Sequence, residues 1–185
     1  MRVIAGSARH LPLKTPMGMH TRPTSDKIKE TLFNILQNRL YDVRFLDLFA
    51  GSGGIGIEAL SRGASVAAFV DDNRDAVRCI EENLEFTKFT EQALVFRKDV
   101  IGALRSLEKL EPFDIIFMDP PYGKDFEKQV LTYLADSSIV TEDTLLILET
   151  LCDQDVSYVK DLGFRITRRK EYKNNMHVFL ERAED

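Results

Sequence analysis

Apolar residues fall into short runs that alternate with amphipathic stretches of helical length along most of the chain. The apolar runs predict strands at 45–49, 66–70, 93–96, 113–118 and 144–149. The stretches between them predict a helix ending near Ser61, helices over 73–86, 100–109 and roughly 125–135, and a short helix near 154–161. Because strict alternation of strand and helix is typical of right-handed βαβ units, these segments predict a parallel sheet.

The alternation stops at both ends of the chain. Residues 164–172 and 176–181 read as two strands joined by only residues 173–175, which predicts a hairpin and hence one antiparallel strand. At the other end, residues 2–5 and 11–14 predict a short hairpin, and Thr24 or Ser25 begins a helix that runs to about Arg39. The predicted fold is α/β: a doubly wound, mostly parallel seven-stranded sheet with a C-terminal antiparallel hairpin and a small N-terminal hairpin–helix extension.

Composition adds a division of charge to this picture. The chain of 185 residues has a net charge of −5. Residues 1–40 hold seven cationic and two acidic side chains, a balance of +5, so the other 145 residues carry −10. We therefore expect a basic extension over 1–40 packed on a main domain over 41–185, and the asymmetry favours an anionic partner for the basic part. A second basic cluster lies near the C-terminus, at Arg165, Arg168, Arg169, Lys170 and Lys173.

Several classes of protein are disfavoured by what the sequence lacks. It has no apolar run long enough to cross a bilayer and no apolar leader at its start. Two cysteines far apart and three scattered histidines form no disulfide framework or metal-binding pattern. We expect a cytoplasmic protein with no membrane partner and no metal.

One motif stands directly after the predicted strand 113–118, namely Asp119-Pro120-Pro121-Tyr122. The Asp119 carboxylate can accept hydrogen bonds from an amino group. Proline has no N–H, so the carbonyls of Asp119 and Pro120 are less readily used in local turns. The Tyr122 ring offers a face on which a base can stack. Together these groups can hold a planar exocyclic amine.

A glycine-rich loop follows the first strand of the alternating part. Residues 51–56 fit the pattern G-x-G-x-x-G, and Asp71 lies 20 residues after Gly51 at the end of the next strand, where an acid can bind ribose hydroxyls. That arrangement suits a dinucleotide equally well. Asp47 inside the first strand suits a cationic amino-acid end, and Asp99 with the Val100 N–H suits an adenine. A ligand with ammonium, ribose and adenine and no required phosphate is S-adenosylmethionine.

The motifs resemble those of known enzymes. Residues 47–53, DLFAGSG, resemble the first motif of Rossmann-like S-adenosylmethionine-dependent methyltransferases, and residues 119–122 resemble the [DNS]-P-P-[YF] motif of their amino-methylating branch. Residues 1–6 and 22–36, with RPTSDKIKETLFNIL in the second, resemble the start of the RsmD family. Members of that family methylate a guanine N2 in bacterial 16S ribosomal RNA.

The resemblance implies a role for each matching residue. Asp119, Pro120 and Tyr122 would be catalytic, and Pro121 would contact the base. Many relatives have Glu in place of Asp71, so a two-pronged grip on the ribose is less assured here. The basic extension would hold phosphates of the RNA through Arg9, Lys14 and Arg22. The implied cofactor-binding residues are Asp47, Phe49, Ala50, Gly51, Ser52, Gly53, Asp71, Asp99 and Val100.

Other functions stay open from the sequence. A DNA adenine-N6 methyltransferase or a protein-glutamine methyltransferase would share the amine-holding motif. A non-catalytic RNA-binding module could retain the same fold, and an NAD-linked oxidoreductase would share the glycine loop. The preferred partner is 16S rRNA, either free or within an assembling small ribosomal subunit.

Overall fold

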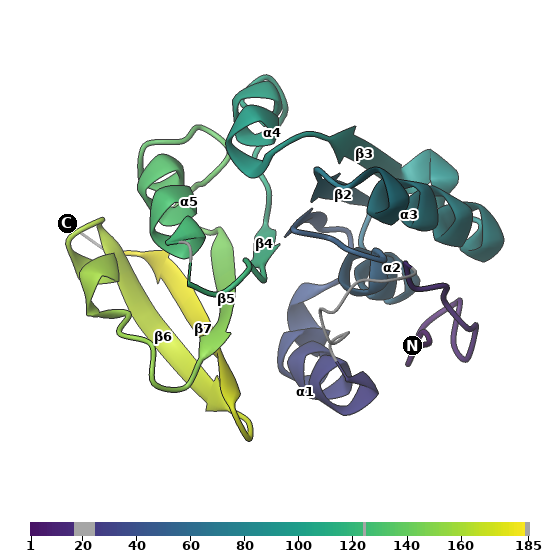
Figure 1. Ribbon diagram of the computed structural model, residues 1–185, viewed down its shortest axis with the longest axis horizontal. Coiled ribbons are helices and arrows are strands. Elements are labelled where there is room, and N and C mark those ends of the chain that lie inside the picture. The colour runs from purple at the N-terminus through teal and green to yellow at the C-terminus, as the bar shows by residue number, and fades with distance from the viewer. Residues whose placement is uncertain (17–24, 124, 184–185) are drawn as a thin grey trace.

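The computed structural model describes residues 1–16, 25–123 and 125–183 (Figure 1). Within them the strands form one seven-stranded sheet in the order β3-β2-β1-β4-β5-β7-β6. The predicted fold class is confirmed, with β1 to β5 parallel and β7 antiparallel to both of its neighbours. The strands are β1 (Arg44–Leu48), β2 (Val66–Asp71), β3 (Ala93–Arg97), β4 (Ile115–Met118), β5 (Leu145–Leu151), β6 (Phe164–Glu171) and β7 (Asn175–Arg182).

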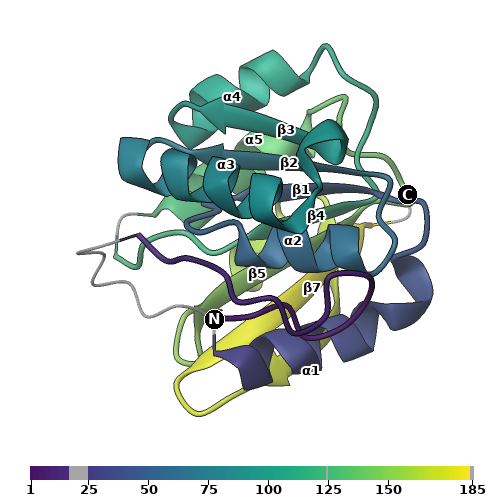
Figure 2. The ribbon, with the colours of Figure 1, turned by 90° about the vertical axis from the view of Figure 1, so that its right-hand side faces the viewer.

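Helices cover both faces of the sheet (Figures 1 and 2). One hydrophobic core joins the sheet to α1 (Asp26–Leu36), α2 (Gly54–Ser61) and α3 (Arg74–Thr87). The other joins it to α4 (Val100–Leu107), α5 (Phe126–Ala135) and the short 3₁₀ helix η3 (Ser157–Lys160). Two further 3₁₀ turns are η1 (Gln37–Arg39) and η2 (Thr90–Gln92). No described helix has the length and apolar character needed to span a bilayer.

The register of β1 and β4 decides which loops meet. These strands are parallel neighbours, with Leu48 paired to Met118, although β2 and β3 separate them in sequence. Their carboxyl ends therefore lie side by side at one edge of the sheet. The loop after β1 leads to α2 on one face, and the loop after β4 leads toward α5 on the other. A crevice outside such a point is the usual ligand site of open parallel sheets.

The N-terminal segment forms less regular structure than predicted. The expected strands over 2–5 and 11–14 reduce to a single antiparallel bridge between Arg2 and Pro12, because the intervening turn packs on α2 instead of extending a ladder. Val3, Ala8 and Leu13 are nevertheless buried in the core that contains α1 and α2.

A buried carboxylate ties this segment down. Glu58 of α2 accepts the N–H groups of Ile4 and Ala5 at 2.8 and 3.0 Å, and it pairs with Lys29 and Arg62 at 3.4 and 2.8 Å. Because Lys29 and Glu58 are both buried, the segment, α1 and α2 are joined through one compensated charge cluster.

Candidate active site

The loop after β1 is shaped by backbone conformations that glycine tolerates. Gly51 and Gly53 have φ angles of 58° and 78°, and Phe49 has a φ of 65°. The Ala50 N–H donates to the Val70 carbonyl at 2.8 Å, so the loop is fastened to β2 as it leaves β1. Gly53 is the N-cap of α2. The turn presents the amino end of α2 at the carboxyl edge of the sheet, where backbone N–H groups favour electron-rich partners.

Asp47 lies beneath this loop rather than on its surface. Its side chain is on the face of β1 that α2 covers, the residue is 1% exposed, and Oδ2 accepts the Gly56 N–H at 3.1 Å. A Cβ at position 56 would lie 2.3 Å from the Phe69 ring, so glycine permits α2 to approach the sheet this closely. Burial raises the pKa of Asp47 to about 8, against the opposing effect of the Gly56 hydrogen bond.

Asp71 lies beside the glycine loop and is hydrogen-bonded to it. Its Oδ2 accepts the Gly51 N–H at 2.8 Å and its Oδ1 accepts the Asn73 N–H at 2.9 Å. Burial raises the pKa of Asp71 even though both hydrogen bonds favour the ionised form. Because a carboxylate has about four lone-pair sites, each oxygen can accept one further hydrogen bond. The side chain can therefore bind a ligand hydroxyl without releasing the loop.

Asp99 and Val100 lie at the start of α4, beyond β3. Asp99 is the N-cap of α4, with Oδ1 accepting the Gly102 N–H at 2.8 Å, and it is exposed. Val100 is buried and opens the helix. Since one Asp99 oxygen is used for capping, the other oxygen and the N–H groups of the first helical turn are the groups that could meet an adenine.

The residues after β4 bring a carboxyl group to this edge of the sheet. Among the described residues, none donates a hydrogen bond to the Asp119 side chain, which is half-buried. Burial, then the charges of Glu149 and Asp47, hold the pKa of Asp119 well above its usual range. Pro120 is buried and Pro121 is exposed. An unpaired carboxyl in such a place is poised for a ligand donor.

Tyr122 completes the motif at the surface. Tyr122 is 48% exposed, which leaves part of the side chain open for stacking. Burial of the hydroxyl, followed by the charges of Asp119 and Glu149, raises the pKa of Tyr122 to about 12, so the hydroxyl stays protonated at neutral pH.

An aromatic contact joins the two loops. The rings of Phe49 and Phe126 lie 6.0 Å apart between centroids and are tilted by 54°. Phe49 belongs to the loop after β1, and Phe126 begins α5 just beyond the Asp119–Tyr122 motif. The two motifs therefore meet at one edge of the sheet.

Glu149 is a member of this site that the sequence did not reveal. It sits near the end of β5 on the same face as Asp47 and Asp119, and the strand order places the three acids on neighbouring strands β1, β4 and β5. We call Asp47, Asp119 and Glu149 the acidic row. An acid inside the apolar run 145–151 is a signal of a buried polar role that could have been noticed.

A hydrogen-bonded chain supports Glu149 from the hairpin. The His177 Nε2 lies 2.9 Å from the Glu149 Oε2, and the Tyr172 hydroxyl lies 3.0 Å from the His177 Nδ1. The Asn175 side chain donates to the other Glu149 oxygen. His177 is fully buried and stacks edge-on with Phe117. The C-terminal hairpin thus fixes the orientation of the carboxylate beside Asp119.

The basic residues of the N-terminal segment are scattered. Arg9 is exposed in the turn that packs on Ser61, at the far end of α2, about 12 Å along that eight-residue helix from the glycine loop. Lys14 is nearer: its backbone is linked through Asn83 to the Ser52 carbonyl, but its ammonium pairs with Glu82 at 2.8 Å. That pairing raises the pKa of Lys14. Arg22 lies outside the described residues.

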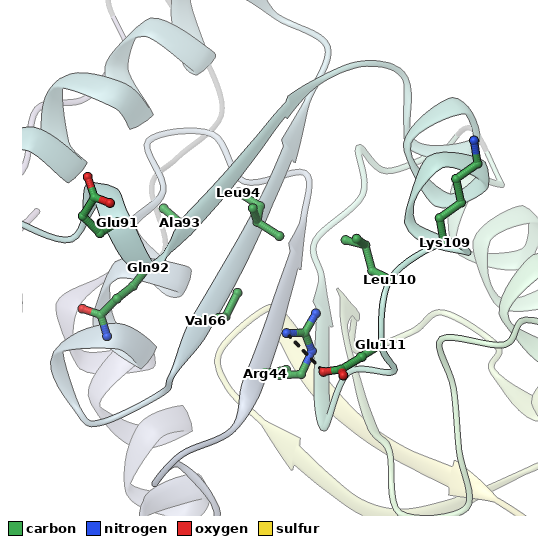
Figure 3. A pocket seen from close by; sticks show the side chains of 9 residues that line it. All are labelled: Arg44, Val66, Glu91, Gln92, Ala93, Leu94, Lys109, Leu110 and Glu111. Atoms are coloured by element: carbon green, nitrogen blue, oxygen red, sulfur yellow. Dashed lines mark ion pairs between the residues drawn. The ribbon is translucent and has the colours of Figure 1, made fainter.

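A pocket elsewhere on the molecule does not share this chemistry. It is lined at the opposite edge of the sheet by residues such as Arg44, Val66 and Leu110, and Arg44 pairs with Glu111 at 4.0 Å (Figure 3). Arg44 and Val66 begin β1 and β2, so this pocket is separated from the acidic row by the length of the strands. No group of three His, Cys, Asp or Glu side chains suited to a metal ion occurs among the described residues.

The strand order, the glycine loop over the acidic row and the Asp119–Tyr122 motif after β4 define a Rossmann-like methyltransferase. Comparison with known proteins agrees. The chain is 41% identical over 172 residues to YlbH of Bacillus subtilis, described as a candidate rRNA methyltransferase, covering 92% of each chain. It is 34% identical to ribosomal RNA small subunit methyltransferase D of Haemophilus influenzae, covering 83% of this chain and 80% of that one.

A solved structure and a family match complete the comparison. The solved structure of a candidate methyltransferase, yhhF, from Escherichia coli superposes with a TM-score of 0.85 at 29% identity, over 100% of this chain and 99% of that one. Residues 1–181 match the family described as Conserved hypothetical protein 95. The chain belongs to this family, which confirms the resemblance to the RsmD family and makes the protein a methyltransferase.

Replacing Asp47 by Asn should change how stability depends on pH. The carboxyl has a pKa of about 8 in the fold and about 3.8 when unfolded, so the native state binds the extra proton between these values. The wild-type protein therefore loses stability as pH rises from about 4 to 8, whereas the Asn variant lacks this loss and still accepts the Gly56 N–H. We expect denaturant unfolding without ligand to give Asp47→Asn a free energy of unfolding that rises, relative to that of wild type, by on the order of 3–5 kcal/mol between pH 4 and pH 9. Parallel curves for the two proteins would contradict the burial of the charge.

Proposed function

We propose that this protein is an S-adenosylmethionine-dependent methyltransferase that transfers a methyl group to the exocyclic N2 of a guanine in small-subunit (16S) ribosomal RNA. The observation that supports it most is the Asp119 carboxyl, which no described residue satisfies and which stands beside the glycine loop. A carboxyl held in this way fits an amino group as its ligand. The names of the relatives point to ribosomal RNA as the molecule that carries the amine.

The residues of the first loop fit S-adenosylmethionine. Asp47 offers a buried carboxyl to an ammonium, Asp71 can bind ribose hydroxyls while holding Gly51, and Asp99 with the Val100 N–H can bind an adenine. A side-chain atom at Gly51 would meet nothing within 4 Å, so the loop surface there is open to a ligand. When bound, the cofactor supplies a methyl group on a positively charged sulfur.

Asp119 acts on the nucleophile. A guanine N2 lone pair is delocalised into the ring, so the amine must become pyramidal before it can attack. The Asp119 carboxylate and the Pro120 carbonyl, each accepting one N–H, would favour that geometry. Positive charge grows on the nitrogen during methyl transfer, so the attraction to Asp119 strengthens toward the transition state, as catalysis requires. Positioning by these groups can supply roughly 7–11 kcal/mol of the barrier.

Tyr122 holds the base in place. Its half-exposed ring can stack on guanine, a contact that contributes about 1–3 kcal/mol per base. A guanine inside a duplex cannot reach a pocket at the edge of a sheet, so the target nucleotide must be unpaired or flipped out. Nucleotides around it would then run over the surface next to the motif.

The reaction is tested by offering radiolabelled cofactor with unmethylated small ribosomal subunits, free 16S rRNA and duplex DNA, and by analysing the product nucleosides. We expect N2-methylguanosine from an RNA substrate. Asp119→Ala should lower turnover by at least about 10²-fold, because it removes charge stabilisation of the transition state, and should leave the cofactor dissociation constant within about twofold. N6-methyladenosine in DNA, or turnover near wild type in the Ala variant, would reject the proposal.

Asp99 is best tested without disturbing α4. Because Asp99 caps this helix, an Ala variant would lose about 1 kcal/mol of stability along with any adenine contact. Asp99→Ser keeps a capping oxygen but shortens the side chain. Cofactor affinity, measured by calorimetry, should fall roughly tenfold in Asp99→Ser, the loss of about one charged hydrogen bond, with thermal stability nearly unchanged. Equal affinities in wild type and Asp99→Ser would remove Asp99 from the adenine site.

Cofactor binding should also release a proton from Asp47. The free protein holds this carboxyl mostly protonated at neutral pH, since its pKa is about 8. An adjacent ammonium favours the ionised form and lowers that pKa. Calorimetry at pH 7 in buffers of different ionisation enthalpy should report about one proton released by wild type and none by Asp47→Asn. Equal proton release in both proteins would place the ammonium elsewhere.

A further inference from the structure

A groove with one basic wall runs between α1 and the edge strand β6. It is lined by Thr31, Asn34 and Ile35 of α1 and by Arg168, Arg169 and Lys170 of β6. We call it the α1–β6 groove. Figure 2 shows α1 and the β6–β7 hairpin on the same side of the molecule. The groove thus joins an N-terminal helix to the C-terminal basic cluster, which are far apart in sequence.

A β-bulge turns two of the cations into the groove. Pairing shifts between Ile166 and Arg168, so Ile166 pairs with Leu180 and Arg168 pairs with Phe179. Directly paired residues project to the same face of an antiparallel sheet. Phe179 belongs to the core that contains α1, and Leu180 belongs to the core of the opposite face. Arg168 therefore projects to the α1 side of the sheet, because the extra residue Thr167 reverses the alternation of side chains between the two faces. Lys170, two residues further along β6, projects to the same side.

No described residue neutralises these cations. Among the described residues, no carboxylate pairs with Arg168 or Lys170, and no group hydrogen-bonds the Asn34 side chain. Their neighbours Arg39 and Arg165 differ, since both pair with Glu181 at 3.2 and 3.3 Å. Unpaired cations with a neutral amide between them, on a chain of net charge −5, form a local site for a polyanion.

The groove lies on the same face as the acidic row. In the strand register, Lys170 of β6 lies opposite His177 of β7, and His177 lies opposite Glu149 of β5. Strand β5 is the neighbour of β4. Three strand spacings separate Lys170 from the Asp119 position, or about 14 Å at the usual spacing of about 4.8 Å. A chain whose base is held by Asp119 and Tyr122 can therefore place a nearby part of its backbone in the groove.

We propose that the α1–β6 groove binds the phosphate backbone of the RNA substrate on one side of the target nucleotide. Arg168 and Lys170 contact phosphates, and Asn34 donates to a phosphate or sugar oxygen. This inference rests on the proposed function for the identity of the RNA. It assigns the main phosphate contacts to the hairpin and α1 rather than to Arg9, which lies at the far end of α2.

The test is the double variant Arg168→Gln/Lys170→Gln, which keeps polar side chains and removes two charges. Its matched control is Arg105→Gln/Lys109→Gln, two exposed cations on or just after α4 on the opposite face. Affinity for unmethylated small ribosomal subunits and for 16S rRNA is measured by fluorescence anisotropy at several salt concentrations. Cofactor affinity is measured in parallel.

We expect the groove variant to bind RNA roughly tenfold more weakly and to lose about 1.4 from the slope of log K against log salt, or about 0.7 for each phosphate contact. KM for RNA should rise while kcat at saturating RNA stays near wild type, because the lost contacts stabilise the bound substrate and the transition state equally. The control should match wild type in all of these measurements. Cofactor affinity should be unchanged in both variants.

The outcomes separate this inference from the proposed reaction. A groove variant that binds RNA with wild-type affinity and slope overturns the groove, whether or not methyl transfer is seen. An equal loss in the control also overturns it, because the effect would then be one of total charge. Loss confined to the groove variant supports the groove, and it does so even if the wild-type product is not N2-methylguanosine, in which case only the reaction is rejected.

Discussion

The site depends on three carboxyl groups that the sheet forces close together. Asp47, Asp119 and Glu149 occupy one face of β1, of the turn after β4 and of β5 at the carboxyl edge. Burial raises the pKa of both Asp47 and Asp119. Repulsion from Asp71 adds to the effect at Asp47, and repulsion from Glu149 and Asp47 adds to it at Asp119, so ionising these carboxyls is costly in the free protein. A cationic ligand offsets that cost. The arrangement that makes these carboxyls costly to ionise in the free protein would therefore favour the proposed ligands, a cofactor ammonium and an amine that becomes positive as it reacts.

The strand order is what makes this crowding possible. β1 and β4 are neighbours, yet their following helices α2 and α5 pack on opposite faces, so their loops diverge and leave room between them. The antiparallel β7 then inserts between β5 and β6. Its His177 reaches Glu149, and Tyr172 reaches His177, so the hairpin orients one end of the acidic row. The C-terminal hairpin is thus part of the site and not only the edge of the sheet.

Local patterns predicted the fold and most of the residues proposed for the site, and long-range pairing accounts for what they left out. The period of the apolar residues indicated every strand of the sheet, and the strand ends placed Gly51 and Asp119 at one edge. Glu149 could not be assigned, because its partner His177 depends on the register between β5 and β7. The count of charges pointed to Arg9, but packing of its turn on Ser61 carries it away from the site. The number of charged residues can be counted in a sequence, whereas the face of the sheet on which a charged side chain lies depends on the strand register and on packing.

The bulge at Thr167 illustrates the same point for function. In a regular ladder Arg168 would share the face of Ile166, over the core that contains α4 and α5. One extra residue moves the unpaired cations to the face of the acidic row. The result is a gradient along that face, from carboxyls that favour an amine to cations that favour phosphates. A nucleotide has its amino group on the base and its charge on the backbone, so the gradient would orient an RNA strand with the base toward Asp119 before any sequence is read.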